Sequence, residues 1–171
     1  KYIGKDSYKN LKLSGSGASS LNGLSDVLIE TNSIYLGNDP SSSSNSAQYN
    51  VGIGVDVFNA ITTGDNNTAV GFYSLDANTT GEKNTALGGA TLTDNTSGKE
   101  NTAIGYDAMA RNTTGDYNTA VGANAGDAVT DAERITAIGR DALGVAVSQD
   151  DCTAVGYAAL DAATSGDGNT A

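Results

Sequence analysis

Three consecutive stretches of the chain, each of 17 residues, decide the fold. Read from residue 67 to residue 117, they are NTAVGFYSLDANTTGEK, NTALGGATLTDNTSGKE and NTAIGYDAMARNTTGDY. Every stretch opens with Asn-Thr-Ala, an aliphatic residue and Gly, and self-similarity at a fixed period is the mark of a repeat architecture. The same spacing extends in both directions without insertions, so eight lines of 17 residues run from Ser33 to Gly168.

The composition of one line favours strands over helices. Gly, Thr and Asn recur throughout, and all three are poor helix formers. The opener places Thr and the aliphatic residue on one face of an extended segment, and Ala and Gly on the other. We therefore predict an all-β fold, a parallel β-solenoid with one 17-residue coil per line. Eight rungs at about 4.8 Å would span roughly 38 Å.

Stacking the lines in register sorts the side chains into columns with separate roles. We predict that two aliphatic columns form the core. Their members are Val70, Leu87, Ile104, Val121, Ile138 and Val155 in the first, and Leu75, Leu92, Met109, Leu143 and Leu160, with Phe58 upstream, in the second. A third column, of Asn67, Asn84, Asn101 and Asn118, predicts a ladder of side-chain amides that pair along the axis.

Charge and composition exclude several classes of protein. Asp and Glu outnumber Lys and Arg by 20 to 9, a formal net charge of −11, so a nucleic acid would be repelled. The chain has no His and one Cys, which removes the commonest metal ligand and any Cys-cluster zinc site. No apolar run is long enough for membrane insertion. We expect no cofactor, and we interpret the chain as a segment of a longer polypeptide.

The repeat also carries a resemblance to known families. The openers Asn-Thr-Ala-Val/Ile-Gly, followed by Ala-Leu and Asn-Thr-Thr-Gly, resemble the repeats of bacteriophage tail fibres and the head repeats of trimeric autotransporter adhesins. Those head repeats are usually shorter and richer in Ser-x-Ala-x-Gly, from which this sequence departs. The resemblance covers roughly residues 21–171. It implies a left-handed β-roll in a homotrimer, on a virion, that serves host attachment; a bacterial cell-surface adhesin is the alternative.

Two regions are expected along the chain. Residues 1–32 differ from the repeat and are predicted to form a neck or connector, while residues 33–171 form the solenoid. A coil of 17 residues encloses little, so we expect the core to be too thin to stand alone. The recurring Ala and Gly suggest that another copy of the chain packs on their face. Adjoining fibre segments, and a host surface glycan or protein, are the other expected partners.

Carboxylates form one further column near the turn of each line. Its members are Asp65, Glu82, Asp116, Glu133, Asp150 and Asp167, with Lys99 between them. Stacked like charges repel, so these side chains either splay into solvent or share a cation. Asp150, Asp151 and Asp167 are weak candidates for calcium ligands, and otherwise no metal site is expected.

Catalysis and ice binding are the remaining hypotheses for function. A glycan hydrolase needs paired carboxylates in a cleft, and no loop is inserted between lines to build one, so we expect no enzyme. A regular Thr column, such as Thr85, Thr102 and Thr119, is typical of ice-binding solenoids. Because Thr shares its face with the aliphatic column, we predict that it points inward or lies at a bend, which makes ice binding a distant alternative.

Two successive lines depart from the pattern and mark a candidate contact patch. Gly126 replaces the aliphatic residue of the second column in one line, and Ile135 replaces Asn in the next. Both lines also lose the turn Gly, the easiest residue to place in a left-handed backbone conformation, so we expect their corners to bend differently. The residues of the possible patch are Asp131, Glu133, Arg134 and Arg140.

Overall fold

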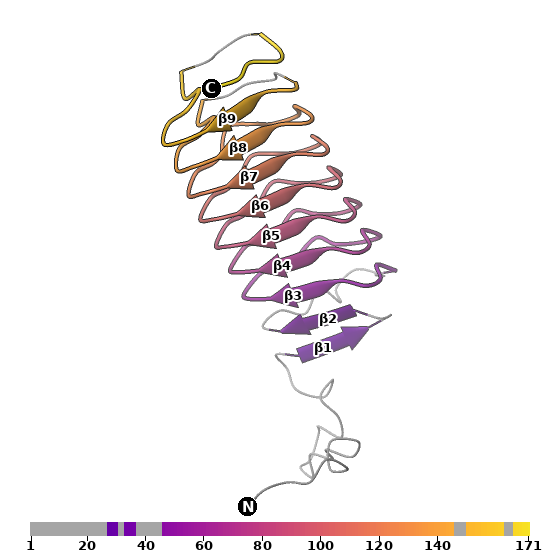
Figure 1. Ribbon diagram of the computed structural model, residues 1–171. Coiled ribbons are helices and arrows are strands. Elements are labelled where there is room, and N and C mark those ends of the chain that lie inside the picture. The colour runs from indigo at the N-terminus through magenta and orange to yellow at the C-terminus, as the bar shows by residue number, and fades with distance from the viewer. Residues whose placement is uncertain (1–26, 31–32, 37–45, 146–149, 163–165) are drawn as a thin grey trace, which may run out of the picture.

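A computed structural model describes residues 27–30, 33–36, 46–145, 150–162 and 166–171, and within them all regular structure is β-strand. Nine strands form one sheet in sequence order (Figure 1). They are β1 Val27–Glu30, β2 Ser33–Leu36, β3 Val51–Ile53, β4 Thr68–Val70, β5 Thr85–Leu87, β6 Thr102–Ile104, β7 Thr119–Val121, β8 Thr136–Ile138 and β9 Thr153–Val155. Within the described residues, no helix could cross a membrane.

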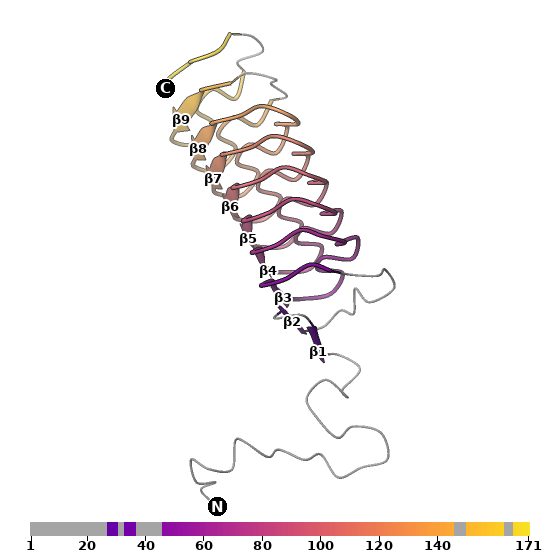
Figure 2. The same ribbon diagram turned by 90° about the vertical axis from the view of Figure 1, so that its right-hand side faces the viewer.

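Every strand from β2 to β9 pairs in parallel with the next, offset by one repeat. Thr68 lies opposite Thr85, and Thr85 opposite Thr102, which is a step of 17 residues each time. Viewed from the side, the chain closes one coil and rises to the next, giving about six turns between β3 and β9 (Figure 2). The parallel β-solenoid with 17-residue coils is therefore confirmed. β1 instead pairs antiparallel with β2, and the rest of the predicted neck at 1–32 lies outside the described residues.

The strands face the opposite way from the sequence prediction. The buried residue of each opener is the central Ala: Ala69, Ala86, Ala103, Ala120, Ala137 and Ala154 are at most 1% exposed. The aliphatic column that was predicted to fill the core lies outside instead. Leu87, Ile138 and Val155 are 48%, 39% and 57% exposed, and Val70, Ile104 and Val121 are half-buried.

The reason for this correction is the width of the coil. The interior of a 17-residue coil is narrow, and the second predicted column already fills the space opposite the strand. Phe58, Leu75, Leu92, Met109 and Leu143 are buried as expected, and Leu160 is partly buried against them. Only Ala is small enough to stand opposite that column, since a protein interior is packed to nearly crystalline density. The Thr and aliphatic side chains of the opener therefore turn to solvent.

The Asn column forms a buried ladder, but its amides do not pair with one another as predicted. Asn84 Nδ2 donates to the carbonyl of Gly98 at 2.8 Å, and Asn84 Oδ1 accepts the backbone N–H of Asn101 at 3.0 Å. Each Asn thus satisfies two buried backbone groups of the adjacent coil, which a buried strand end requires. Direct amide pairing occurs in a second column that the sequence analysis missed, where Asn95 Nδ2 donates to Asn78 Oδ1 at 2.8 Å.

Glycine has two different roles in each coil. The Gly that ends the opener has a φ of 130–141°, as at Gly105, and a Cβ there would collide with the next coil's carbonyl. The turn Gly, as at Gly115, is not among the residues with positive φ and is required for close approach instead. The expectation that its loss bends the corner is wrong for Ala132, whose carbonyl accepts Asn118 Nδ2 at 2.7 Å, as the Gly115 carbonyl accepts Asn101 Nδ2. The φ of Ala132 is likewise not positive.

Candidate functional site

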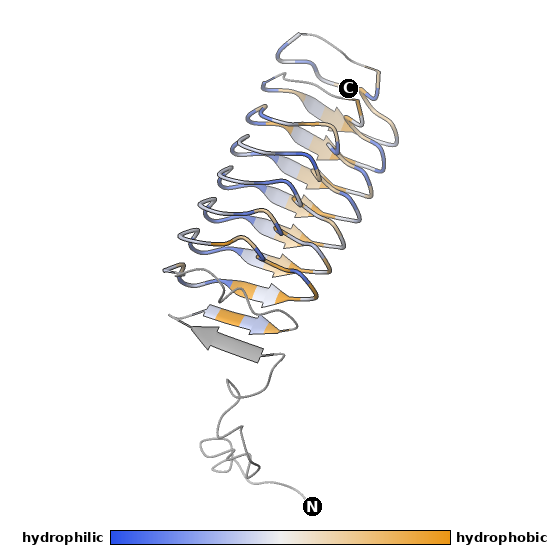
Figure 3. Ribbon diagram, turned by 180° about the vertical axis from the view of Figure 1, so that it is seen from behind, coloured by the Kyte–Doolittle hydropathy of each residue, from blue (hydrophilic) through white to orange (hydrophobic). Residues whose placement is uncertain are grey.

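The first candidate surface is the outer face of the strands β3 to β9. In every coil it carries a Thr or Val followed by Val, Leu or Ile, two columns that run the length of the sheet without a charged residue. Figure 3 shows that apolar residues recur at the ends of the strands, while the turns that precede them are hydrophilic. A contiguous apolar stripe of this kind is typical of a surface that contacts another molecule.

Ion pairs between coils lie along the edge that precedes the strands. Lys83 pairs with Glu100 at 2.9 Å, and Lys99 with Glu82 at 3.4 Å. In the upper coils Arg134 lies 2.6 Å from Asp151 and 3.6 Å from Asp150, and it also pairs with Glu133. The hydrogen bond from Arg134 lowers the pKa of the Asp151 carboxyl below its ordinary value.

The carboxylate column has a structural role that the sequence analysis did not predict. Asp65, Asp116 and Asp150 each accept a backbone N–H from the preceding coil, at 2.7, 2.6 and 2.9 Å. Asp167 does the same for Asp150 at 3.3 Å. The calcium candidates are thus engaged by N–H groups and Arg134, and no group of three metal-ligating side chains occurs among the described residues. Stacked carboxylates are tolerated because each receives a donor.

Two of the four residues of the predicted contact patch form an ion pair with one another, Arg134 and Glu133. Arg134 lies before β8 and binds carboxylates, whereas Arg140 lies after β8 and pairs with Asp141 at 3.2 Å. Asp131 accepts the Thr130 hydroxyl at 3.0 Å. Asp131, Glu133 and Arg134 thus precede strand β8, and Arg140 follows it.

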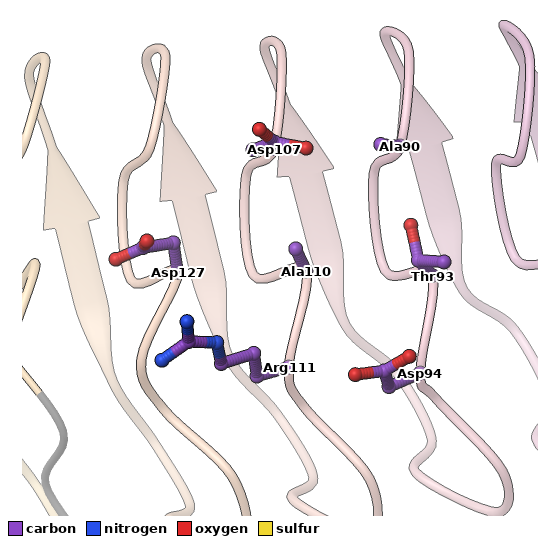
Figure 4. A pocket seen from close by; sticks show the side chains of 7 residues that line it. All are labelled: Ala90, Thr93, Asp94, Asp107, Ala110, Arg111 and Asp127. Carbon is purple, nitrogen blue, oxygen red and sulfur yellow. The ribbon is translucent and has the colours of Figure 1, made fainter.

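Another candidate surface is a hollow that is lined by the segments following strands β5, β6 and β7 (Figure 4). Its volume is about 320 Å³. Ala90 and Ala110 form its floor, where neighbouring coils carry larger side chains at the same positions, such as Tyr73, Asp107 and Asp127. Two short side chains in consecutive coils thus create a depression that larger residues at these positions would fill.

Polar side chains surround this hollow. They are Thr93, Asp94, Asp107, Arg111 and Asp127, and Figure 4 shows that Arg111 extends toward the coil of Asp127. Burial raises the pKa of the Asp127 carboxyl, with the Arg111 guanidinium opposing that rise. Asp127 Oδ1 is buried without a hydrogen-bond partner in the described part of the chain.

An exposed aromatic cluster adjoins the hollow. Phe72 contacts Tyr73 edge-to-face, with ring centroids 5.9 Å apart, and contacts Tyr106 at 6.3 Å. These three side chains are 47%, 46% and 55% exposed. Phe72 and Tyr106 are two coils apart and meet because Gly89 lies between them, where a Cβ would collide with the Phe72 ring. Sequence reasoning missed this cluster because it depends on which coil carries which residue.

The sequence matches no protein-family model, no curated protein and no solved structure. The geometry of these surfaces therefore carries the functional argument.

Proposed function

We propose that the chain is a structural and adhesive segment of a trimeric phage tail fibre that projects toward the host bacterial surface. The observation that carries this proposal is the outer strand face, where Leu87, Ile138 and Val155 are exposed on a regular sheet. A stripe of aliphatic side chains as long as the solenoid would be covered by an equally long partner. A second and third copy of the same chain provide that partner without any further protein.

In the proposed assembly, three left-handed coils face one another through this stripe. Rotational symmetry places the same face of each chain against the axis, which closes the assembly and leaves no apolar face free. The charged edge with Lys83, Glu100 and Arg134 then lies at the rim, where exposed ion pairs are tolerated. The interface differs from the Ala and Gly face predicted from sequence, since that face lies inside the coil.

Sedimentation of the purified chain tests the assembly. We expect a species of three times 17.2 kDa, which Ile104→Asp together with Val121→Asp would convert to monomers. Thr80→Asp, at an exposed turn, is the matched control and should leave the trimer intact. A wild-type monomer at micromolar concentration would contradict the proposal.

Location separates the tail fibre from its alternative, a head segment of a bacterial trimeric autotransporter-like adhesin. An antibody against the chain should label the tails of virions in electron micrographs and should block their adsorption to host cells. Labelling of intact bacteria in the absence of phage would favour the adhesin instead.

Ice binding is a second candidate, because the reason to disfavour it no longer holds. The Thr column lies on the outer face, in register from Thr68 to Thr153, instead of pointing inward as predicted. An ordered, uncharged array of hydroxyl and methyl groups on a flat sheet is suited to ordered water. Thermal hysteresis of the purified chain, abolished by Thr102→Leu and Thr119→Leu, would support this candidate; a trimer that buries the face would exclude it.

A further inference from the structure

We propose that the hollow after strands β5 to β7, together with the Phe72, Tyr73 and Tyr106 cluster, binds an uncharged glycan. This inference rests on the proposed adhesive function and names the chemical class of the ligand and its place on the fibre. Three features of this surface point to such a ligand: exposed aromatic rings, polar groups around the hollow and the sign of the local charge.

The aromatic cluster provides the apolar contact. Pyranose rings present faces of C–H groups, which pack on aromatic rings because the ring faces carry negative charge density. Phe72 and Tyr106 lie two coils apart and remain in ring contact over Gly89, so they form a continuous platform along the axis. Each ring in the cluster is about half exposed. The surface available for stacking is thus already formed and needs no rearrangement.

The hollow provides the polar contacts. Within the part of the chain that the structure describes, the side chains of Asp94, Asp107 and Arg111 accept or donate no hydrogen bond and form no ion pair. Carboxylates accept from sugar hydroxyls, and a guanidinium donates to their oxygens, so the set fits a polyhydroxylated ligand.

Platform and hollow are parts of one surface. Ala90, on the floor of the hollow, donates its backbone N–H to the Phe72 carbonyl at 2.8 Å, and Asp107 directly follows Tyr106 in the chain. The Thr93 hydroxyl donates to the Tyr73 carbonyl at 3.3 Å. One sugar residue on the rings would therefore place a neighbouring residue over the carboxylates.

Local charge selects the ligand. Three carboxylates and one guanidinium line the hollow, and the whole chain has a net charge of −11. An anionic polysaccharide would be repelled, which leaves uncharged glycans. A volume of about 320 Å³ is at the lower end of the size range of small-molecule sites, roughly 300–1,000 Å³. Such a hollow would hold one or two sugar units of a longer chain.

The test uses an array of immobilised uncharged glycans built from hexose, deoxyhexose and N-acetylhexosamine units, with heparin and polysialic acid as anionic probes. The strongest uncharged glycan is then titrated in solution by calorimetry. We expect the double variant Phe72→Ala, Tyr106→Ala to weaken binding about tenfold, the ratio that corresponds to 1.4 kcal/mol. Arg111→Met, which keeps the length of the side chain but removes its donors, should have a similar effect.

Tyr117→Ala is the matched control, because Tyr117 is 54% exposed but belongs to a different column. It should bind as the wild type does. Arg111 is exposed and forms no hydrogen bond or ion pair through its side chain within the described residues, so its variant remains informative if loss of the two rings disturbs folding.

Three results would overturn the inference: no binding to any uncharged glycan, a preference for heparin or polysialic acid, or binding that both site variants leave unchanged. A chain that trimerises and labels virion tails but gives one of these results would refute the glycan site alone. A monomeric chain found on neither virions nor bacteria would refute the proposed function, whatever its glycan binding.

Discussion

The coils that begin at Asn67, Asn84 and Asn101 differ in their interior from those that begin at Ile135 and Cys152. In the lower coils, two buried corners are filled by Asn side chains. Those of the first corner donate to backbone carbonyls, and those of the second pair with one another from coil to coil. In the upper coils, the first of these corners holds Ile135 and Cys152, both buried. The backbone hydrogen bonds between coils at the strand are the same in both sets. The backbone N–H of Thr85 donates to the Asn101 carbonyl at 2.8 Å, and that of Thr136 donates to the Cys152 carbonyl at 2.8 Å.

Backbone pairing between coils therefore fixes the coil, and a corner residue only has to agree in polarity with the residues above and below it in its own column. Where the first Asn ladder stops, its last member Asn118 keeps both bonds, whereas the last member of the second ladder loses a partner. Asn112 Oδ1 is buried without a hydrogen bond in the described structure, because the next residue of its column is Val129, which has no side-chain donor. A change from polar to apolar interior is therefore tolerated at the cost of a single unsatisfied acceptor.

The largest effect on stability should come from Asn84→Ala, in the coils with an Asn-filled interior. It removes the donor to the Gly98 carbonyl and the acceptor for the Asn101 N–H, both buried. Two buried unpaired groups at about 1–3 kcal/mol each give a loss of roughly 2–6 kcal/mol in the free energy of unfolding, measured by urea denaturation.

Cys152→Ala is the matched variant in the apolar region of the same column. The contacts of its Sγ with the carbonyls of Asp150 and Gly166 are long, 3.6 and 3.7 Å, and the substitution removes one small buried group, so we expect a loss of about 1 kcal/mol. Equal losses at the two positions would contradict the comparison between the coils.

The second prediction contrasts the two faces of one strand. Ala103→Leu inserts a large side chain where the interior is completely buried, and overpacking should lower the free energy of unfolding by about 1–3 kcal/mol. Thr102→Leu, the adjacent outward position, should change the stability of the isolated chain little. The thermal midpoints of the two variants decide the question, and a larger loss for Thr102→Leu would mean that the faces are reversed.

Much of the architecture could be predicted from the sequence, because it depends on spacing. The period of 17 set the in-register parallel pairing, and the column of Leu75, Leu92 and Met109 was correctly placed inside. Which face of each strand is buried could not be predicted from alternation, because alternation defines two faces without showing which one the coil encloses. Hydrophobicity alone predicts burial of the face with Val, Leu and Ile, whereas the narrow coil accommodates only the small Ala side chains on its inner face. The constancy of Ala at 69, 86 and 103, beside a variable Val, Leu or Ile, is the signal that could have shown it.

The hollow and its aromatic cluster were beyond prediction for a different reason. They arise from departures within the repeat, such as Gly89 between Phe72 and Tyr106, and each departure taken alone is indistinguishable from drift. Only the register of three adjacent coils brings the departures together. The columns of the repeat show the residues that the coils share, whereas the hollow depends on residues that occur in one coil and not in the next.

A third prediction concerns pH and the Asp127 carboxyl. Burial raises its pKa above the ordinary 3.8, so its contribution to stability is fully present below about pH 3.8 and is lost as pH rises through the higher folded value. Asp127→Asn should therefore raise the thermal midpoint at pH 7 and leave it unchanged near pH 3.5. Asp76 has its pKa raised by the same cause in the lower coils, and Asp76→Asn should show the same sign. A midpoint difference that does not vary with pH would contradict burial as the cause.

The smallest effect should come from Arg134→Gln, although Arg134 contacts three carboxylates. All these groups are about half exposed, so water and salt screen their attraction, and ordering long side chains offsets much of the gain. The thermal midpoint should fall slightly at low ionic strength and match the wild type in 1 M NaCl, where the Debye length is about 3 Å. The pKa of Asp151 should return toward its ordinary value, since the hydrogen bond from Arg134 is the main cause of its lowering. Lys83→Gln, which breaks a single pair in the polar coils, is the control and should behave alike. If Arg134→Gln remained destabilised in 1 M NaCl, the coils that begin at Ile135 and Cys152 would depend on this arginine in place of their missing Asn ladder. The two sets of coils would then differ in their surface ion pairs as well as in their interior.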